Sequence, residues 1–144
     1  MKQNYKDIIE RYYHTWFSIS ELYALWAKRH GLTVNSLLAL YVIQNTKNCT
    51  QHDICSQLML SKQTVNSILN NFDQLGYVIK IVGNSDKRSK SIKFTSEGQR
   101  YADKVLSELF EAESAAFQAM SPEHITGLIE GNQRFLDNFR NTLK

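Results

Sequence analysis

The chain has 144 residues, an apolar fraction of 42% and a formal net charge of +3. This size predicts a single domain per chain, large enough to bury a core of its own. No stretch has the uncharged apolar length needed to cross a bilayer, and the beginning of the chain lacks the apolar core of a secretory signal. We therefore expect a cytoplasmic protein that contacts no membrane.

The first third of the chain predicts two helices. Apolar and aromatic side chains recur at helical spacing over residues 5–30, and Gly31 can end this long amphipathic helix. Thr33 is a candidate N-cap for a second helix, which contains the apolar run 37–43 and ends in the polar residues 44–48.

A helix-turn-helix is predicted next. Thr50 and Asp53 have the spacing of a capping box, which opens a short helix carrying Ile54 and Leu58. Residues 59–60 form a tight connection to Ser61, a candidate N-cap of the following helix. Two helices joined in this way form a helix-turn-helix.

The helix after Ser61 has two unlike faces. Its apolar face repeats at spacings of three and four residues through Val65, Ile68, Leu69, Phe72 and Leu75. Its polar face carries Lys62, Gln63, Asn66, Ser67 and Asn70. Short donors and acceptors of this kind read base edges or bind phosphates, whereas a solvated helix more often carries Glu and Lys pairs. The competing interpretation is an ordinary solvated face.

A basic β-wing is predicted after Gly76. Residues 77–82 and 91–94 have the composition of two strands, joined by a loop rich in turn residues. Between residues 76 and 100 six basic side chains stand against two acidic ones, a local charge of +4, so the rest of the chain sums to about −1. A local basic loop beside a polar helix is typical of a surface that binds nucleic acid.

Two further helices are expected at the end of the chain. Thr95 can cap one that continues to Met120, and Ser121 followed by Pro122 restarts a last helix. The expected fold is mainly α with a small two-stranded β-wing, in the order helices, helix-turn-helix, wing and helices.

Nearly the whole chain resembles the MarR-family winged helix-turn-helix transcription regulators. The most specific similarity is the segment Asp86-Lys87-Arg88-Ser89-Lys90, which is similar to the family's D-x-R-x-K loop, followed by the strand-to-helix boundary at 94–98. The resemblance implies that Arg88 enters the minor groove and that Asp86 holds it in place. A narrow minor groove has enhanced negative potential, and a weakly hydrated guanidinium fork suits it. The alternative is a surface ion pair of small energetic value.

The resemblance also implies a homodimer that binds double-stranded DNA at a pseudo-palindromic operator, more often as a repressor. It makes 1–144 a single domain in which 1–32 and 120–144 are dimerisation helices, 33–98 is the winged helix-turn-helix lobe and 96–120 is a connecting helix. The expected DNA-binding residues are Thr50, Gln51, Ser61, Lys62, Gln63, Thr64, Asn66, Ser67, Asn70, Asp86, Lys87, Arg88 and Lys90. Relatives often carry arginines where this chain has Ser67, Asn71 and Lys80, so we expect weaker phosphate attraction by the helix.

A small-molecule cleft is a further implication of the resemblance. Tyr13, Trp16, Phe17 and Trp26 are hypothetical lining residues, because flat aromatic walls suit phenolic or other apolar effectors. The alternative is that this aromatic stripe is core or dimer interface.

Cys49 and Cys55 match neither a disulfide framework nor a CxxC motif. An alternative function is redox sensing, in which Cys49, near a helix N-terminus, has a lowered pKa and is oxidised by peroxide. Cys49, His52 and Cys55 lack a fourth ligand for zinc, so we expect no metal and no cofactor.

Catalytic motifs are absent from the sequence: it has no G-x-S-x-G, phosphate-binding glycine loop or H-E-x-x-H, so we expect no enzyme. The remaining rival is a winged-helix module that binds a protein. Its binding surface should have an apolar or aromatic anchor at its centre, whereas this one is polar and basic.

Overall fold

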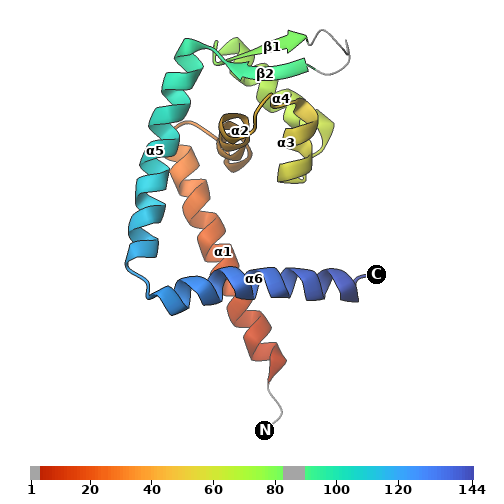
Figure 1. The fold of residues 1–144 in the computed structure, drawn as a ribbon, viewed down its shortest axis with the longest axis vertical. Coiled ribbons are helices and arrows are strands. Elements are labelled where there is room, and N and C mark those ends of the chain that lie inside the picture. Colours follow the sequence, from red (N-terminus) through yellow and green to blue (C-terminus); the bar gives the residue numbers. More distant parts are fainter. Residues whose placement is uncertain (1–3, 83–89) are drawn as a thin grey trace. The chain divides into compact units, whose positions relative to one another are not determined.

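The structure is a computed structural model of the chain that describes residues 4–82 and 90–144 (Figure 1). The elements in chain order are α1 (Tyr5–Arg29), α2 (Val34–Asn45), α3 (Gln51–Leu58), α4 (Lys62–Gln74), β1 (Val78–Val82), β2 (Lys90–Phe94), α5 (Ser96–Gln118) and α6 (Pro122–Thr142). The predicted fold class, mainly α with one small antiparallel sheet, is confirmed. In the described part of the chain, no helix is long and apolar enough to cross a membrane.

The chain divides into two compact units, residues 1–106 and 107–144, with the boundary inside α5. The first unit contains α1 to α4, the wing and the beginning of α5. The second consists of the remainder of α5 and of α6. The assignment of 1–144 to a single domain, with its subdivision into dimerisation, DNA-binding and connecting parts, stays a prediction.

The core of the first unit is built around α2. Five of the twelve residues of this helix are buried, and its element neighbours are α1, α3, α4 and β2. The largest fully buried side chains include Leu37, Leu40, Ile54, Leu69, Phe72, Val78 and Val105. Leu40, Ile54, Leu69, Phe72 and Val78 belong to one buried cluster, so α2, the helix-turn-helix and the wing share an apolar core.

Local capping explains where the helices begin. The hydroxyl of Thr33 accepts a hydrogen bond from the Ser36 amide at 3.1 Å, and Ser61 does the same for Thr64 at 3.1 Å. Thr50 and Asp53 form the predicted capping box. Such side chains satisfy amide groups that have no partner within the helix, and all these caps are confirmed.

The wing is attached to the helix-turn-helix by backbone hydrogen bonds. β1 and β2 pair with Val78 opposite Phe94 and Val82 opposite Lys90. The Ile92 amide also donates to the Cys49 carbonyl at 2.6 Å, just before α3 begins. The orientation of the strands is therefore coupled to the start of α3.

The turn from β2 into α5 depends on close backbone packing. The Thr95 hydroxyl accepts from the Gly98 amide at 3.0 Å, and the Thr95 amide donates to the Tyr77 carbonyl at 3.0 Å. A Cβ on Gly98 would lie 1.9 Å from that same carbonyl oxygen. Only glycine allows this approach without moving the strand or the helix.

Candidate nucleic-acid interface

Helix α4 is anchored by one apolar face. Val65, Ile68, Leu69 and Phe72 are all buried, as their spacing predicts. Leu75, which we expected on the same face, is instead 51% exposed. It is the residue that ends the helix, and the chain turns away at Gly76 with φ +75°, so the helical spacing no longer applies there.

The opposite face of α4 is polar and accessible. Lys62, Gln63, Ser67 and Asn70 are exposed, while Thr64 and Asn66 are half-buried. The Ser67 hydroxyl donates to the Gln63 carbonyl within the helix at 3.2 Å. The structure thus places the expected polar residues of α4 along one side of the helix, although contact with DNA stays a prediction for each.

Gln51 and Asn66 are joined by a hydrogen bond that sequence reasoning did not find. The Gln51 Nε2 donates to Asn66 Oδ1 at 2.7 Å and to the Lys62 carbonyl at 3.2 Å. These bonds link the first residue of α3 to the N-terminal half of α4. The two residues are 15 positions apart, so no local spacing indicates the contact.

Thr50 and Ser61 already have structural roles. The Thr50 hydroxyl accepts from the Asp53 amide at 3.2 Å and lies 2.9 Å from an Asp53 carboxylate oxygen. The Ser61 hydroxyl caps α4 and lies 2.9 Å from the Thr64 hydroxyl. Both residues stand at helix N-termini, where exposed amides and the helix dipole favour phosphate, but their contact with DNA stays a prediction.

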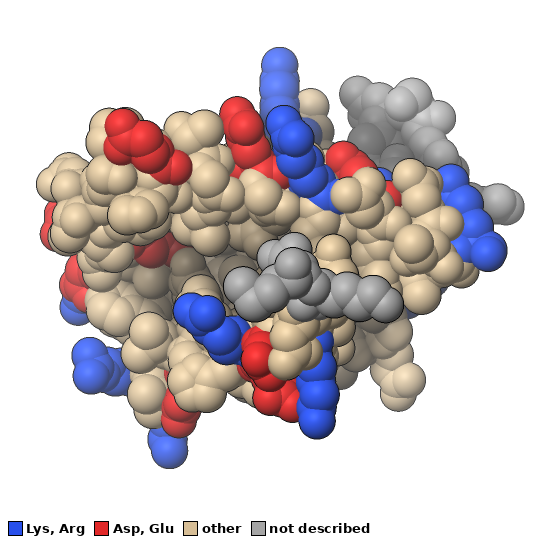
Figure 2. All heavy atoms as spheres, turned by 90° about the horizontal axis from the view of Figure 1, so that it is seen from below, with Lys and Arg blue, Asp and Glu red and all other residues tan. Residues whose placement is uncertain are grey.

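The described part of the wing carries exposed lysines. Lys90 begins β2, and Lys80 and Lys93 are exposed farther along the two strands. The other expected wing residues, Asp86, Lys87 and Arg88, lie outside the described residues, and their roles stay predictions. Elsewhere the charges are mixed: on the face that Figure 2 shows, basic and acidic side chains are interspersed among uncharged ones.

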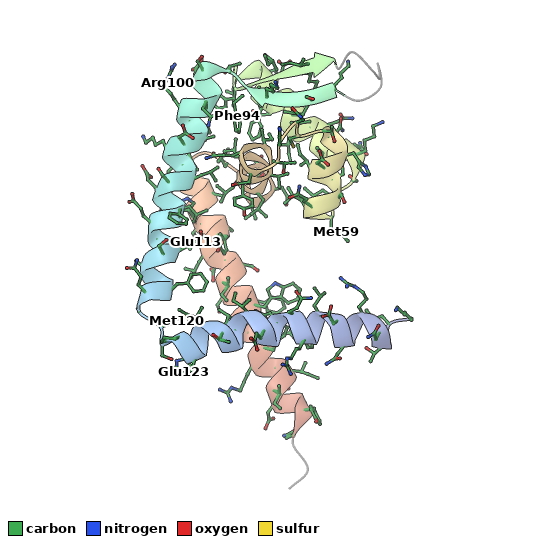
Figure 3. All side chains as sticks on the ribbon, viewed as in Figure 1. Met59, Phe94, Arg100, Glu113, Met120 and Glu123 are labelled. Carbon is green, nitrogen blue, oxygen red and sulfur yellow. The ribbon has the colours of Figure 1, made fainter. Side chains whose placement is uncertain are left out.

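Met59 is an unusual residue in the turn between α3 and α4. It adopts a left-handed conformation, with φ 55° and ψ 39°, and ends α3 by donating its amide to the Cys55 carbonyl. Its side chain projects from the end of the helix and is 87% exposed (Figure 3). A large apolar side chain in this backbone region is uncommon and costs conformational energy.

The redox hypothesis for Cys49 is wrong in its central premise. Cys49 is only 1% exposed, and burial, with a smaller contribution from the Asp53 carboxylate, raises its thiol pKa to about 11. The residue precedes the helix cap, its carbonyl accepts a hydrogen bond from the Ile92 amide of β2, and its thiol is buried, so it is desolvated rather than activated by the helix N-terminus. In residues 4–82 and 90–144, no group of three or more His, Cys, Asp or Glu residues could hold a metal.

The four aromatic residues expected to line an effector cleft do not form one group. Tyr13, Trp16 and Phe17 stack along α1, with ring centroids 5.6–6.0 Å apart, and are about half exposed. Trp26 is half-buried farther along the helix, and its ring lies 5.1 Å from that of His30. The buried Trp26 Nε1 has no hydrogen-bond partner among the described residues. Their effector-binding role stays a prediction.

A helix-turn-helix, α3 and α4, followed directly by a two-stranded wing defines the class of winged helix-turn-helix proteins. Residues 30–89, which include α2, α3, α4 and β1, match the family model described as MarR family. The homoprotocatechuate degradative operon repressor of Escherichia coli is 25% identical over 115 residues, which cover 74% of this chain and 78% of that protein.

Solved structures show the same fold at low sequence identity. FabT of Streptococcus pneumoniae in complex with DNA has a TM-score of 0.77 and 20% identity, covering 98% of this chain and 100% of that one. The S. aureus MepR–DNA complex has a TM-score of 0.75 and 22% identity, covering 88% and 97%. AbsC, a MarR family regulator from Streptomyces coelicolor, has a TM-score of 0.79 and 16% identity, covering 98% of both chains.

Residues 30–89 of the chain are therefore similar to the MarR family of transcription regulators, and the chain as a whole has the fold of solved MarR-family structures. The family resemblance seen in the sequence is confirmed.

Proposed function

We propose that this chain is a sequence-specific regulator that binds a pseudo-palindromic operator as a homodimer and represses transcription. The observation that carries this proposal is the two-sided α4, buried on its apolar face and accessible along its polar face, beside a wing with exposed lysines. A rigidly anchored helix with short donors and acceptors suits the major groove, while lysines suit phosphates. The structural neighbours FabT and MepR were solved with DNA.

A homodimer is supported by the apolar surface of the terminal helices. None of the 21 residues of α6 is buried, although Ile129, Leu136 and Phe139 are large apolar side chains. In α1, Ile8, Ile9 and Leu22 are likewise 42–66% exposed. Large apolar patches are uncommon on monomeric proteins, and a second copy of the chain would cover equivalent patches on both partners.

In the proposed complex the two α4 helices enter successive major grooves about one helical turn apart, roughly 34–36 Å. Lys62 and the wing lysines neutralise phosphates, so affinity falls as the salt concentration rises. Gln63 and Asn66 contact base edges. Arg88, which follows β1 and precedes β2 in the sequence, enters the minor groove, as the resemblance implies.

The test is selection of bound duplexes from a random DNA library by the purified chain at near-physiological salt. We expect an enriched inverted repeat. Gln63→Ala should relax the base preference at one position in each half-site. Lys62→Ala should weaken binding to all sequences about equally and reduce the slope of log affinity against log salt concentration by about one. Lys6→Ala, which removes a charge from α1, serves as the control. An absence of enriched sequences would favour the protein-interaction module instead.

We further propose that a small phenolic or apolar ligand binds near the aromatic residues of α1 and shifts the population away from the DNA-binding conformation. The unpartnered Trp26 Nε1 supports this, because a ligand acceptor would satisfy it. Trp16→Phe leaves Trp26 as the single tryptophan. In that variant a simple phenol should change the Trp26 emission, and an unchanged spectrum at saturating phenol would contradict the assignment.

A further inference from the structure

The Gln51 side chain has both of its amide hydrogens engaged. A carboxamide has two N–H donors, and those of Gln51 point to Asn66 Oδ1 at 2.7 Å and to the Lys62 carbonyl at 3.2 Å. Both side chains are half-buried at the junction of α3 and α4. Two hydrogen bonds on one planar group fix its orientation much more firmly than one bond would.

The orientation of the Asn66 amide follows from that of Gln51. Because Asn66 Oδ1 accepts from Gln51, the Nδ2 group at the other end of the same planar amide is directed away from Gln51. Asn66 is the fifth residue of α4, in the half of a recognition helix that contacts base edges. Its exposed neighbours Gln63, Ser67 and Asn70 mark the accessible side of the helix.

We propose that Gln51 is a positioning residue that presents Asn66 to the major groove as a hydrogen-bond donor. This inference rests on the proposed DNA binding. It specifies which bases the protein prefers at the position that Asn66 contacts. A donor at this place matches adenine N7, guanine N7 and O6, or thymine O4, whereas cytosine offers only its N4 donor. The chain therefore discriminates against cytosine at one position of each half-site.

The decisive variant is Gln51→Glu. The introduced carboxylate can only accept, so it takes a hydrogen bond from Asn66 Nδ2 and turns the amide round. Asn66 Oδ1 then faces the groove and accepts from cytosine N4 or adenine N6. In duplex selection, the frequency of cytosine relative to guanine or thymine at that position should rise roughly tenfold.

Two comparison variants separate orientation from charge and packing. Gln51→Met keeps the side-chain volume but makes neither hydrogen bond, so the preference should relax without reversing. Gln57→Glu introduces the same charge elsewhere on α3 and should keep the parental preference.

Asn66→Asp offers a second route to the same result. It keeps an acceptor for the Gln51 amide and presents a carboxylate oxygen outward, so it should also favour cytosine or adenine. This variant keeps the proposal testable if Gln51→Glu does not fold, which thermal unfolding of each variant establishes.

The outcomes distinguish this inference from the proposed function. If the parent selects an operator and neither Gln51→Glu nor Asn66→Asp raises the frequency of cytosine relative to guanine or thymine at that position, the pair is only a structural link between α3 and α4, and the inference is wrong. If the parent selects no duplex, the proposed function fails and this inference fails with it. A shift toward donor-bearing bases in both variants, with none in Gln57→Glu, supports it.

Discussion

Helices α2 and α6 both carry several large apolar side chains, but only in α2 are such side chains buried. Five of the twelve residues of α2 are buried, whereas none of the 21 residues of α6 is, although α6 carries several large apolar side chains. The winged lobe is therefore complete within one chain. The apolar side chains of α6 are exposed, and we propose that a second copy of the chain covers them.

The largest expected effect separates these two regions directly. Phe72→Ala removes a side chain that is 1% exposed and should lower the free energy of unfolding by about 3–5 kcal/mol. Phe139→Ala removes the same side chain from α6, where it is 49% exposed, and should cost less than about 1 kcal/mol in dilute protein. Urea denaturation measures both, and equal losses would contradict the comparison.

One substitution should have opposite signs in the two regions. Gly98→Ala forces a methyl group against the Tyr77 carbonyl and should destabilise the lobe by about 1–3 kcal/mol. Gly127→Ala in α6 meets nothing within 4 Å and should stabilise the helix by up to about 1 kcal/mol. Thermal unfolding reports the sign. A destabilising Gly127→Ala would indicate that another surface packs against α6 at that point.

Self-association should depend on the apolar stripe of α6. Leu136→Glu introduces a charge into this stripe and should raise the dimer dissociation constant at least tenfold, about 1.4 kcal/mol. Asn138→Glu adds the same charge at an exposed polar position of the helix and should change it little. Sedimentation velocity over a range of protein concentrations makes the measurement. Identical dissociation constants for the two variants would remove α6 from the interface.

The buried Cys49 thiol should make the free energy of unfolding decrease as the pH becomes alkaline. Because burial raises the Cys49 pKa from 9.0 to about 11, the folded state holds its proton where the unfolded state has lost it. Stability is thus fully present below about pH 9 and falls as the pH rises toward 11. Cys49→Ala should flatten this part of the stability profile, and Cys55→Ala should not. A profile that Cys49→Ala leaves unchanged would contradict the burial.

The smallest expected effect concerns Met59, a surface residue of the lobe. Met59→Gly relieves the left-handed conformation and should raise the free energy of unfolding by up to about 1 kcal/mol. Asn48→Gly is the matched control: Asn48 also has a positive φ, of 51°, but asparagine tolerates this region and the gain should be smaller. The difference in Tm between the two variants tests this, and a larger gain for Asn48→Gly would contradict it.

Local chemistry explains which parts of the fold the sequence predicts. Capping needs only a few neighbouring residues, and Thr33, Thr50 with Asp53, and Ser61 all cap the helices as expected. The change from helical to alternating apolar spacing likewise locates the wing after Gly76.

Tertiary contacts explain what could not be predicted. Cys49 has the sequence position of an activated thiol, but pairing with β2 buries it and raises its pKa. The Gln51–Asn66 hydrogen bond depends on the angle between α3 and α4, which residue spacing does not give. For α6, the spacing of apolar residues indicates an amphipathic helix, but the surface that packs against the apolar side cannot be read from that spacing.

The most direct test of the account is the composition of the complex formed with the selected operator duplex. Sedimentation equilibrium of the intact chain with that duplex should give two chains per duplex, with half-sites about 10–10.5 base pairs apart, and binding that weakens steeply with salt. One chain per duplex, or a complex whose affinity is independent of salt, would contradict the proposed dimeric regulator.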